Sequence, residues 1–429
     1  MVWFTPIVSG FNLRDCVFGL AFYFPLFMAW LWMMGGLFYY VRRERGRTNA
    51  DHEPPDVPGT PLASVLIPCM NEQDRIETTI GFALASRYPN LEVIVVNDGS
   101  TDRTGEILDA YAEREPRLRV IHLATNQGKA IGLRTAALVA RSDYLVCIDG
   151  DAYLHPHAVQ WLVYHLATGP RVGAVTGNPR IINRSTLLGR IQVGEFSSII
   201  GLVKRAQRVY GRIFTVSGVI AAFNRGALDR IGYWDERMVT DDIDVSWRLQ
   251  LDYSDIRFES NALCYIFMPE TLRGLWKQRL RWAQGGFEVL IGQGIHLFRW
   301  HRRRFWGVAL EYLVSVCWAY SMLAIFVLFF LGFFLPVPAR WQVQTLLPQW
   351  YGAVLGLTFL IQSLVSLWMD RHHERHHFIG IYCWIIWYPM LYWMLSMFTV
   401  VVAFPKTLLA LSQGQGRRGI WVSPDRGIS

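Results

Sequence analysis

Apolar blocks at both ends of the chain constrain its fold more than any other feature. Residues Cys16 to Val41 form one apolar run, somewhat longer than the roughly 20 residues that a helix needs to cross hydrocarbon. Three more blocks follow near Phe305–Leu335, Tyr351–Met369 and Gly380–Phe404. The composition agrees, because 52% hydrophobic residues and a mean hydropathy of +0.21 are too apolar for a wholly soluble chain of 429 residues. Part of this protein must therefore lie in lipid.

Basic residues beside the apolar blocks predict the orientation of the chain. Four arginines within residues 42–47 place the end of the first run in the cytoplasm. No charged segment precedes that run and no small-residue cleavage site follows it, so we expect an uncleaved anchor. The loop 370–377, with two arginines and four histidines, also suits the cytoplasm. The basic tail would lie outside if all three later blocks crossed, so we expect one of them to be re-entrant or interfacial.

Charge and cysteine usage exclude several classes of protein. The net charge of +8 comes largely from basic residues beside the apolar blocks, and no basic stripe with interleaved aromatics appears in the central part. We therefore expect no nucleic acid partner. The six cysteines are scattered without a CxxC pair, which argues against a disulfide framework or a zinc site. A reduced, cytoplasmic environment fits the central part.

Between the apolar ends, short β-rich runs alternate with amphipathic helical stretches. The runs are Ser64–Ile67, Leu91–Val96, Arg119–Leu123, Tyr144–Ile148 and Val172–Thr176, and the helical stretches are Arg75–Ala85, Thr104–Glu115 and Lys129–Arg141. This alternation predicts an α/β domain with a mostly parallel sheet and helices on both faces. Ligands of such sheets bind outside the carboxyl ends of the strands.

Acidic residues stand at those strand ends. Asp98 lies just past the second run, and Asp149-Gly150-Asp151 follows the fourth. Two carboxylates around a glycine are oxygen ligands for a hard divalent ion such as Mg²⁺ or Mn²⁺. Such an ion would neutralise charge on a diphosphate leaving group. Acidic turns are common, so either cluster alone is a weak signal.

Polar residues near the first strand and the third helix add candidates for the same ligand. Pro68, Asn71 and Glu72 follow the first strand, where the two polar side chains could face a base or ribose. Lys129 begins a helix and would place a cation and amide donors near an anion. Ordinary turn chemistry and a solvated surface lysine are the structural alternatives.

Three carboxylates crowd the start of another predicted helix, in Thr240-Asp241-Asp242-Ile243-Asp244. Favourable interaction with the helix dipole is the simple explanation. The functional interpretation is that Asp242 acts as general base on an acceptor hydroxyl. Upstream, Ser217-Gly218 would let the backbone approach a bound sugar closely.

An amphipathic stretch from Thr271 to Arg304 is typical of a helix that lies on a membrane surface. Within it, Gln278, Arg281 and Trp282 occupy neighbouring parts of the helix surface. Arg281 could bind diphosphate as a planar fork, and Trp282 offers a face for a sugar ring. Interfacial Arg and Trp are common in any membrane protein, which leaves a purely structural alternative open.

These clusters, in this order, resemble those of the processive family 2 glycosyltransferases, which include cellulose, chitin and hyaluronan synthases. The resemblance covers Ala63 to about Gly286 and implies a GT-A type domain. It implies that Asp98 contacts uridine, that Asp149 and Asp151 hold metal-bound UDP, and that Asp242 is the base. It also implies that Gln278, Arg281 and Trp282 form the QxxRW signature of processive members. Asp241 stands where the family motif has Glu, which puts the positioning of that carboxylate in doubt.

Within that family, the chain resembles bacterial synthases of poly-β-1,6-N-acetylglucosamine. The resemblance rests on the runs Val175–Arg180, Ile191–Leu202, Trp276–Gly286 and Trp421–Gly427. It implies a biofilm enzyme that extends a growing polysaccharide from UDP-N-acetylglucosamine and feeds it across the inner membrane. Because no room remains for a regulatory domain after the last block, it also implies a small membrane partner subunit, with cyclic-di-GMP sensed at their interface.

Three alternatives remain open. A hyaluronan- or chitin-type synthase and a lipid-linked single-sugar transferase would keep the same domain, although the processive signature speaks against the latter. A catalytically silent membrane scaffold or nucleotide sensor would have no need of Asp98, Asp149, Asp151, Asp242 and Arg281 together.

The patterns predict a multi-pass protein of the bacterial inner membrane with a cytoplasmic catalytic domain. Its expected segments are a membrane anchor (1–43), a Pro-rich linker (44–62), the GT-A domain (63–270), amphipathic interfacial helices (271–304), a transmembrane region (305–404) and a basic tail (405–429).

Overall fold

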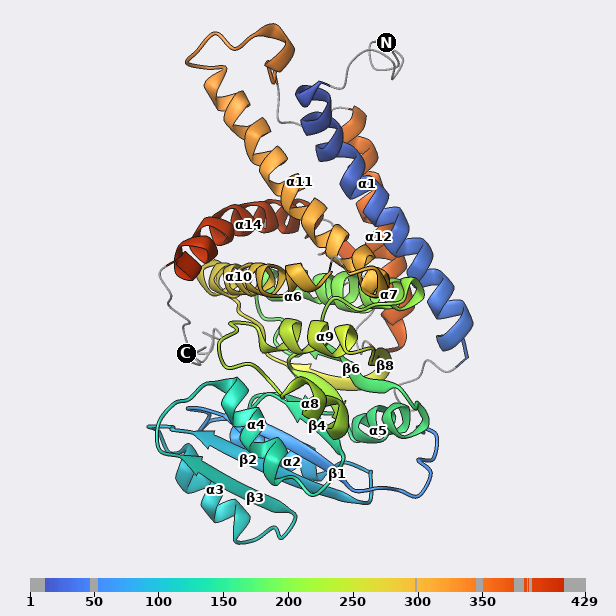
Figure 1. The fold of residues 1–429 in the computed structure, drawn as a ribbon, viewed down its shortest axis with the longest axis vertical. Coiled ribbons are helices and arrows are strands. Elements are labelled where there is room, and N and C mark those ends of the chain that lie inside the picture. Colours follow the sequence, from blue (N-terminus) through green and yellow to red (C-terminus); the bar gives the residue numbers. More distant parts are fainter. Residues whose placement is uncertain are drawn as a thin grey trace.

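The computed structural model describes residues 12–46, 53–297, 299–344, 350–373, 382–383, 385 and 388–412. An α/β domain forms one end of the molecule, a band of nearly horizontal helices lies next to it, and long helices rise from that band (Figure 1). The tail beyond residue 412, most of the histidine-rich loop and the run Trp421–Gly427 lie outside the described residues.

In the described residues, eight strands form one sheet in the order β3-β2-β1-β4-β7-β6-β8-β5. The strands are β1 (Ala63–Cys69), β2 (Leu91–Asp98), β3 (Leu118–Leu123), β4 (Tyr144–Ile148), β5 (Tyr153–Leu154), β6 (Val172–Ile181), β7 (Ile220–Asn224) and β8 (Asp255–Ile266). The pairs β3-β2, β2-β1, β1-β4 and β6-β8 are parallel. The predicted mostly parallel sheet is therefore confirmed, and all five predicted runs are strands.

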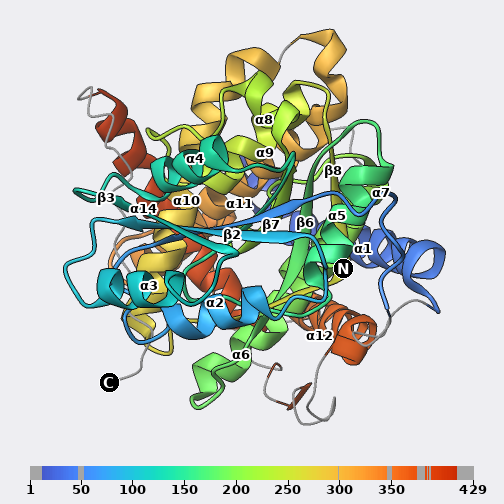
Figure 2. The same cartoon turned by 90° about the horizontal axis from the view of Figure 1, so that it is seen from below.

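Helices cover both faces of the sheet, as the alternation predicted. The helices of the domain are α2 (Ile76–Leu84), α3 (Thr104–Ala112), α4 (Lys129–Val139), α5 (Ala158–Thr168), α8 (Arg225–Ile231) and α9 (Asp241–Leu251). Figure 2 shows α2 and α3 on one face and α4, α8 and α9 on the other. Each face of the sheet packs against its helices in a separate hydrophobic core. Alternate residues of β1 point into different cores, since Val65 and Ile67 lie in the core on the α2 side and Leu66 lies in the core on the α4 side. Burial on both faces explains why the central strands β1, β2 and β4 are largely apolar.

Strand β7 runs antiparallel between β4 and β6, which the sequence did not indicate. Because of this direction, the start of β7 lies beside the end of β4, with Ile220 opposite Ile148. Residues that precede β7 therefore reach the same sheet edge as residues that follow β4. This geometry brings Ser217-Gly218 to Asp149 across about 70 residues of chain.

The remaining helices form the band and the rising group. They are α1 (Leu13–Tyr39) with the π-helix η1 (Tyr40–Glu44), α6 (Leu187–Glu195), the π-helix η2 (Phe196–Val203), α7 (Lys204–Tyr210), α10 (Leu272–Leu297), the 3-10 helix η3 (Trp300–Phe305), α11 (Trp306–Leu331), the 3-10 helix η4 (Ala339–Trp341), α12 (Trp350–Asp370), the 3-10 helix η5 (Arg371–His373) and α14 (Tyr388–Ser412). The predicted amphipathic stretch is thus two elements, α10 and η3.

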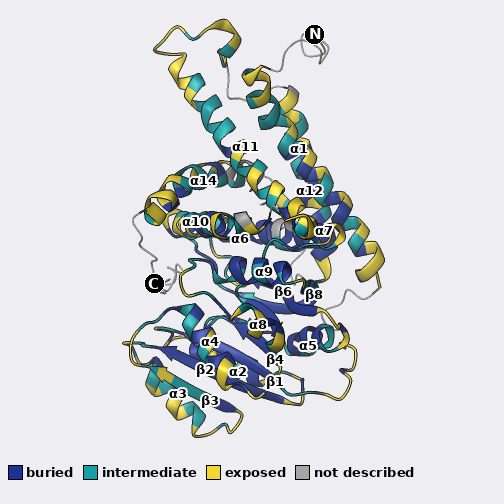
Figure 3. Cartoon of the chain, in the orientation of Figure 1, coloured by how far each residue is buried: buried dark blue, intermediate teal, exposed yellow. Residues whose placement is uncertain are grey.

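Four helical segments within the described residues are long and apolar enough to cross a membrane: Leu13–Glu44, Trp300–Leu331, Tyr351–His373 and Tyr392–Ser412. Figure 3 colours much of α1 and α11 as exposed or partly exposed, and Phe27, Trp30 and Leu310 are among their exposed residues. Such apolar surface is stable in contact with lipid tails, so these helices suit a bilayer.

Helix α14 differs from the other three in direction. It packs lengthwise on α10 and lies across the direction of α1, α11 and α12 (Figure 1). The expectation that one block is interfacial therefore has a specific candidate. If α1, α11 and α12 each cross the bilayer once, the arginines after α1, before α11 and after α12 all lie on one side, whatever the course of α14.

Candidate active site

The ends of β1 and β2 meet through side chains that follow the strands. Asn71, with a positive φ of 53°, accepts a hydrogen bond from Thr101 N at 2.8 Å, and its own N–H donates to Ser100 Oγ at 2.9 Å. Glu72 is buried, and its N–H donates to Thr104 Oγ1 at 2.9 Å. Pro68 lies inside β1 and is paired with Val96, and the pairing continues to Cys69 beside Asn97, so the expectation that Pro68 follows the strand is wrong. The residues predicted at this edge thus lie together and brace the two loops against each other.

Asp98 is completely buried at the end of β2 and organises the loop before α4. Its Oδ1 accepts from Gln127 N at 2.7 Å and its Oδ2 accepts from Gly128 N at 2.8 Å. Gly128 has φ of +94°, a conformation that favours glycine. Each carboxylate oxygen keeps a further acceptor site, so this bracing leaves capacity for a ligand.

Lys129 joins three chain segments at one point. Its Nζ donates to Asp149 Oδ1 at 2.5 Å and to the Gly218 carbonyl at 2.9 Å. Burial alone would lower the pKa of Lys129, but the carboxylates of Asp149, Asp241 and Asp242 outweigh it and hold that pKa above its ordinary value. The lysine is therefore a fixed cation within the acidic site, and the solvated-surface alternative is wrong.

The Asp149-Gly150-Asp151 turn closely follows the buried end of β4. A Cβ at Gly150 would lie 2.9 Å from Cys69 Cβ, so the turn packs tightly on the end of β1. Asp149 and Asp151 supply hard oxygen donors suited to Mg²⁺ or Mn²⁺. No group of three His, Cys, Asp or Glu that could hold a metal occurs in the described part of the chain. The two carboxylates would supply part of the ligand set of such an ion.

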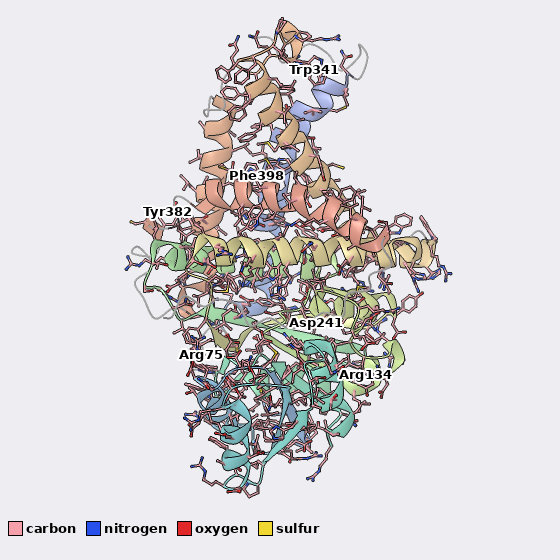
Figure 4. All side chains as sticks on the ribbon, turned by 90° about the vertical axis from the view of Figure 1, so that its left-hand side faces the viewer. Arg75, Arg134, Asp241, Trp341, Tyr382 and Phe398 are labelled. Atoms are coloured by element: carbon pink, nitrogen blue, oxygen red, sulfur yellow. The ribbon has the colours of Figure 1, made fainter. Side chains whose placement is uncertain are left out.

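The first turn of α9 brings Asp242 to the Ser217-Gly218 turn. A Cβ at Gly218 would lie 3.1 Å from Asp242 Oδ2, so the missing side chain leaves room beside this carboxylate. Asp242 Oδ1 accepts from Ile243 N at 2.9 Å. Figure 4 shows the neighbouring Asp241 just beneath α10, between the α/β domain and the membrane helices.

Electrostatics adjust Asp242 for proton transfer. Burial and then repulsion by Asp241 raise the pKa of Asp242 to about 6, against the opposing charges of Lys129 and Arg281. A carboxylate with this pKa is about ten to one ionised at pH 7, yet it is more basic than an ordinary aspartate. Asp241 thus keeps a role in the site despite its shorter arm.

A buried lysine that sequence reasoning missed lies behind this turn. Lys204 Nζ donates to Thr176 Oγ1 at 2.9 Å, and the same oxygen accepts from Ser217 N at 2.8 Å. Burial lowers the pKa of Lys204 to about 7, and the Asp242 carboxylate opposes that shift. No sequence signal distinguished this lysine, because it is one of several basic residues in the same stretch, together with Arg205 and Arg208.

The predicted motif residues lie on α10 above the acids. Arg281 is close enough to lower the pKa of Asp242 by its charge. Gln278 Oε1 is buried without a hydrogen-bond partner among the described residues, which suits an acceptor for a sugar hydroxyl. Arg279 pairs with Glu195 Oε1 at 2.8 Å and lies 4.1 Å from the Trp282 ring centre. That pair, also missed from sequence, holds the partly exposed indole in place.

Gly285 allows α9 to approach α10. A Cβ at position 285 would overlap the Thr240 side chain. Only glycine therefore allows Thr240, which precedes the first turn of α9, to contact α10. The structure therefore brings Lys129, Asp149, Gly218, Asp242 and Arg281 into one cluster. Asn71, Glu72 and Asp98 lie at neighbouring strand ends, while Gln278 and Trp282 line the α10 side.

Known proteins resemble this chain over most of its length. Residues 64–232 match glycosyl transferase family 2. The poly-β-1,6-N-acetyl-D-glucosamine synthase of Staphylococcus epidermidis is 36% identical over 422 residues, which cover 96% of this chain and 98% of that protein. The synthase of the same description from Staphylococcus aureus strain MSSA476 is 37% identical over 418 residues, covering 96% and 98%.

A solved structure supports the fold. Mannosyltransferase PcManGT from Pyrobaculum calidifontis, in complex with GDP-Man and Mn²⁺, superposes with a TM-score of 0.56 and covers 92% of this chain and 99% of its own. Its sequence identity to this chain is 20%, so the likeness concerns the fold.

Proposed function

This chain belongs to glycosyl transferase family 2 and, within it, to the poly-β-1,6-N-acetyl-D-glucosamine synthases, and we propose that it polymerises N-acetylglucosamine from UDP-N-acetylglucosamine. The observation that carries this proposal is the single cluster of Lys129, Asp149, Gly218 and Asp242 at one sheet edge. It combines a cation for an anionic leaving group with a carboxylate of raised pKa.

The donor occupies the strand ends. Asp98, Asn71 and Glu72 face the nucleoside end, where their polar atoms contact the uracil and ribose. Pro68 shapes the turn that positions them. Arg281 binds the diphosphate as a bidentate fork from the α10 side. A divalent ion bound by Asp149 and Asp151 would neutralise charge on the UDP leaving group, and the two carboxylates suit Mg²⁺ and Mn²⁺ equally.

Asp242 removes the proton from the attacking hydroxyl of the polymer. The hydroxyl oxygen forms a bond to the anomeric carbon from the face opposite UDP, the bond to the diphosphate breaks, and the proton passes to Asp242. One displacement of this kind inverts the anomeric configuration. Ser217 and Gly218 leave space for the terminal sugar beside Asp242. A side chain at position 218 would occupy that space, because its Cβ would already contact the Asp242 carboxylate.

Gln278 and Trp282 bind the acceptor chain. The unpaired Gln278 Oε1 accepts a hydroxyl, and the Trp282 ring, fixed by Arg279, stacks on a sugar. Trp282 is 37% exposed, which leaves part of its face available. A ring held by a buried ion pair binds with little loss of conformational entropy, so it can hold successive sugars during repeated transfer.

The proposal extends to the location of the enzyme and to its partners. We propose that the catalytic domain lies on the cytoplasmic side of a bacterial inner membrane, and that the growing polysaccharide leaves through the helices above it. A small membrane partner subunit and cyclic-di-GMP at their interface complete this proposal. Four helical segments of sufficient length in the described residues support the multi-pass arrangement.

The test is incorporation of radiolabelled sugar from UDP-N-acetylglucosamine by membranes that carry this chain, with and without the candidate partner and cyclic-di-GMP. Digestion with a β-1,6-specific glucosaminidase follows. We expect labelled polymer that the glucosaminidase degrades. Resistant polymer would discard the β-1,6 linkage, and label found only in lipid extracts would favour the single-sugar transferase. Membranes that carry the Asp242→Asn variant are the negative control and should form almost no labelled polymer.

The pKa of Asp242 predicts the acid limb of the pH profile. Because the base must be ionised, kcat/KM should fall about tenfold per pH unit below about 6. Asp241→Asn removes a repulsion that raises this pKa, so the limb should move to lower pH when each profile is scaled to its own plateau. Glu236→Gln, at an exposed position, is the control and should leave the limb in place. An unmoved limb in Asp241→Asn would refute the electrostatic role of Asp241.

A further inference from the structure

A strongly cationic pocket lies away from the acidic site. Its volume is about 230 Å³, and it opens between the far end of α9 and η3. The lining residues are Arg171, Arg212, Gln250, Leu251, Tyr253, His301, Arg302, Arg303, Arg304 and Phe305. Five guanidinium groups line this space, and no carboxylate is among the lining residues. The proposed function makes no use of this pocket.

The arginines of the pocket are poorly compensated. Arg212 lies 4.0 Å from Asp255 Oδ1, but the same oxygen already accepts from Arg208 at 3.0 Å. Among the described residues, no carboxylate pairs with Arg171 or Arg304, and the buried Nε of Arg302 has no hydrogen-bond partner. The arginines therefore repel one another, and an anion in the pocket would relieve that repulsion.

The electrostatic surroundings of Arg212 agree with this geometry. Burial lowers the pKa of Arg212; Asp255 opposes the shift, while the charges of Arg304, Arg208 and Arg171 add to it. Planar guanidinium groups that converge on one space are the usual protein ligands of phosphate, since each can donate two parallel hydrogen bonds.

The position of η3 identifies the source of the phosphate. Its residues open the apolar segment Trp300–Leu331, and η3 packs against α9, α10 and α11. Trp300 is 70% exposed and Trp306 is 38% exposed, so indole rings flank the arginines as they do at membrane interfaces. Figure 1 shows the start of α11 beside α7, where the rising helices meet the band. The pocket is therefore at headgroup level.

We propose that this pocket binds the phosphate of an anionic phospholipid headgroup. The guanidinium groups of Arg171 and Arg212 contact the phosphate from the side of the α/β domain, and Arg304 contacts it from η3 on the membrane side. Leu251 and Phe305 give the pocket an apolar wall for the glycerol backbone. A lipid held here fastens η3 to α9, the helix that carries Asp242 at its other end.

The experiment uses the full-length protein purified in detergent and mixed with equal amounts of phosphatidylglycerol and phosphatidylcholine. Native mass spectrometry counts the lipids retained. Wild type should retain one phosphatidylglycerol in preference to phosphatidylcholine. Arg171→Gln with Arg304→Gln removes two charges without breaking an ion pair, and should weaken retention about fivefold per arginine, or about 25-fold together.

The matched control is Arg42→Gln with Arg43→Gln, which removes the same charge from exposed juxtamembrane positions outside the pocket. It should retain phosphatidylglycerol as wild type does. Polymer synthesis in phosphatidylcholine nanodiscs verifies that the pocket variant is folded, and Arg171→Lys with Arg304→Lys should restore part of the retention. Equal losses in the pocket and control variants would overturn the proposal. Saturable binding of soluble glycerol phosphate without lipid preference would also overturn it.

Discussion

Replacing Asp242 with asparagine is expected to lower polymer formation by about 10² to 10⁴-fold, because an amide cannot take the proton of the attacking hydroxyl. The side chain keeps its shape, and its Oδ1 can still accept from Ile243 N. Loss of one negative charge beside Lys129 and Arg281 should leave UDP binding intact or slightly tighter. Radiolabelled polymer and calorimetric titration with UDP measure the two quantities separately.

Asp252→Asn is a suitable control, since Asp252 follows the opposite end of α9 and pairs with Arg230 at 2.8 Å on the surface. It should synthesise polymer at nearly the wild-type rate. Intact synthesis by Asp242→Asn would exclude this residue as the base. Loss of both UDP binding and polymer would instead indicate that the variant is misfolded, which the thermal unfolding midpoint would reveal.

Replacing Asp370 with asparagine is expected to destabilise the protein by about 3 to 5 kcal/mol, the usual cost of breaking a buried ion pair from one side. Asp370 ends α12 and is completely buried. Its two oxygens contact Arg205 Nη1 at 2.9 Å and Arg180 Nη2 at 2.8 Å, and Arg205 also pairs with Glu44 at 2.9 Å. The cluster joins η1, which continues α1, and the end of α12 to α7 and to β6 of the α/β domain.

The expected result is a lower unfolding midpoint in detergent and less folded protein in membranes. Asp15→Asn removes an exposed carboxylate near the start of α1 and should leave the midpoint unchanged. An Asp370→Asn protein as stable as wild type would mean that water or a rearranged Glu44 compensates the two arginines. Polymer synthesis per folded molecule separates a stability effect from a catalytic one.

Local sequence signals predicted much of the site. Asp98 and Asp149 stand at or just past apolar runs that form parallel strands, and the carboxyl ends of parallel strands meet at one edge whatever the rest of the fold does. The start of α9 carried its own signal, because three carboxylates in one helical turn are unusual. The QxxRW spacing likewise placed Arg281 and Trp282 on one helix.

Other contacts carried no local signal. Lys204 contributes to the site only because α7 packs behind Thr176, and Glu195 fixes Trp282 only because α6 lies beside α10. Gly285 is one glycine among the 36 of the chain until Thr240 approaches it. The clustering of the pocket arginines also joins loops that are more than 100 residues apart.

The amino-acid sequence by itself determined the apolar segments, the alternation that makes an α/β domain, and the chemical types of the site residues. These are properties of hydrophobic periodicity and of side-chain chemistry, which act over a few residues. Only the tertiary structure decided the antiparallel insertion of β7, the crosswise course of α14, and the pKa of Asp242. These three features depend on burial and on charges that lie far apart in the sequence. Such long-range contacts are selected by the packing of the whole fold and not by the local sequence.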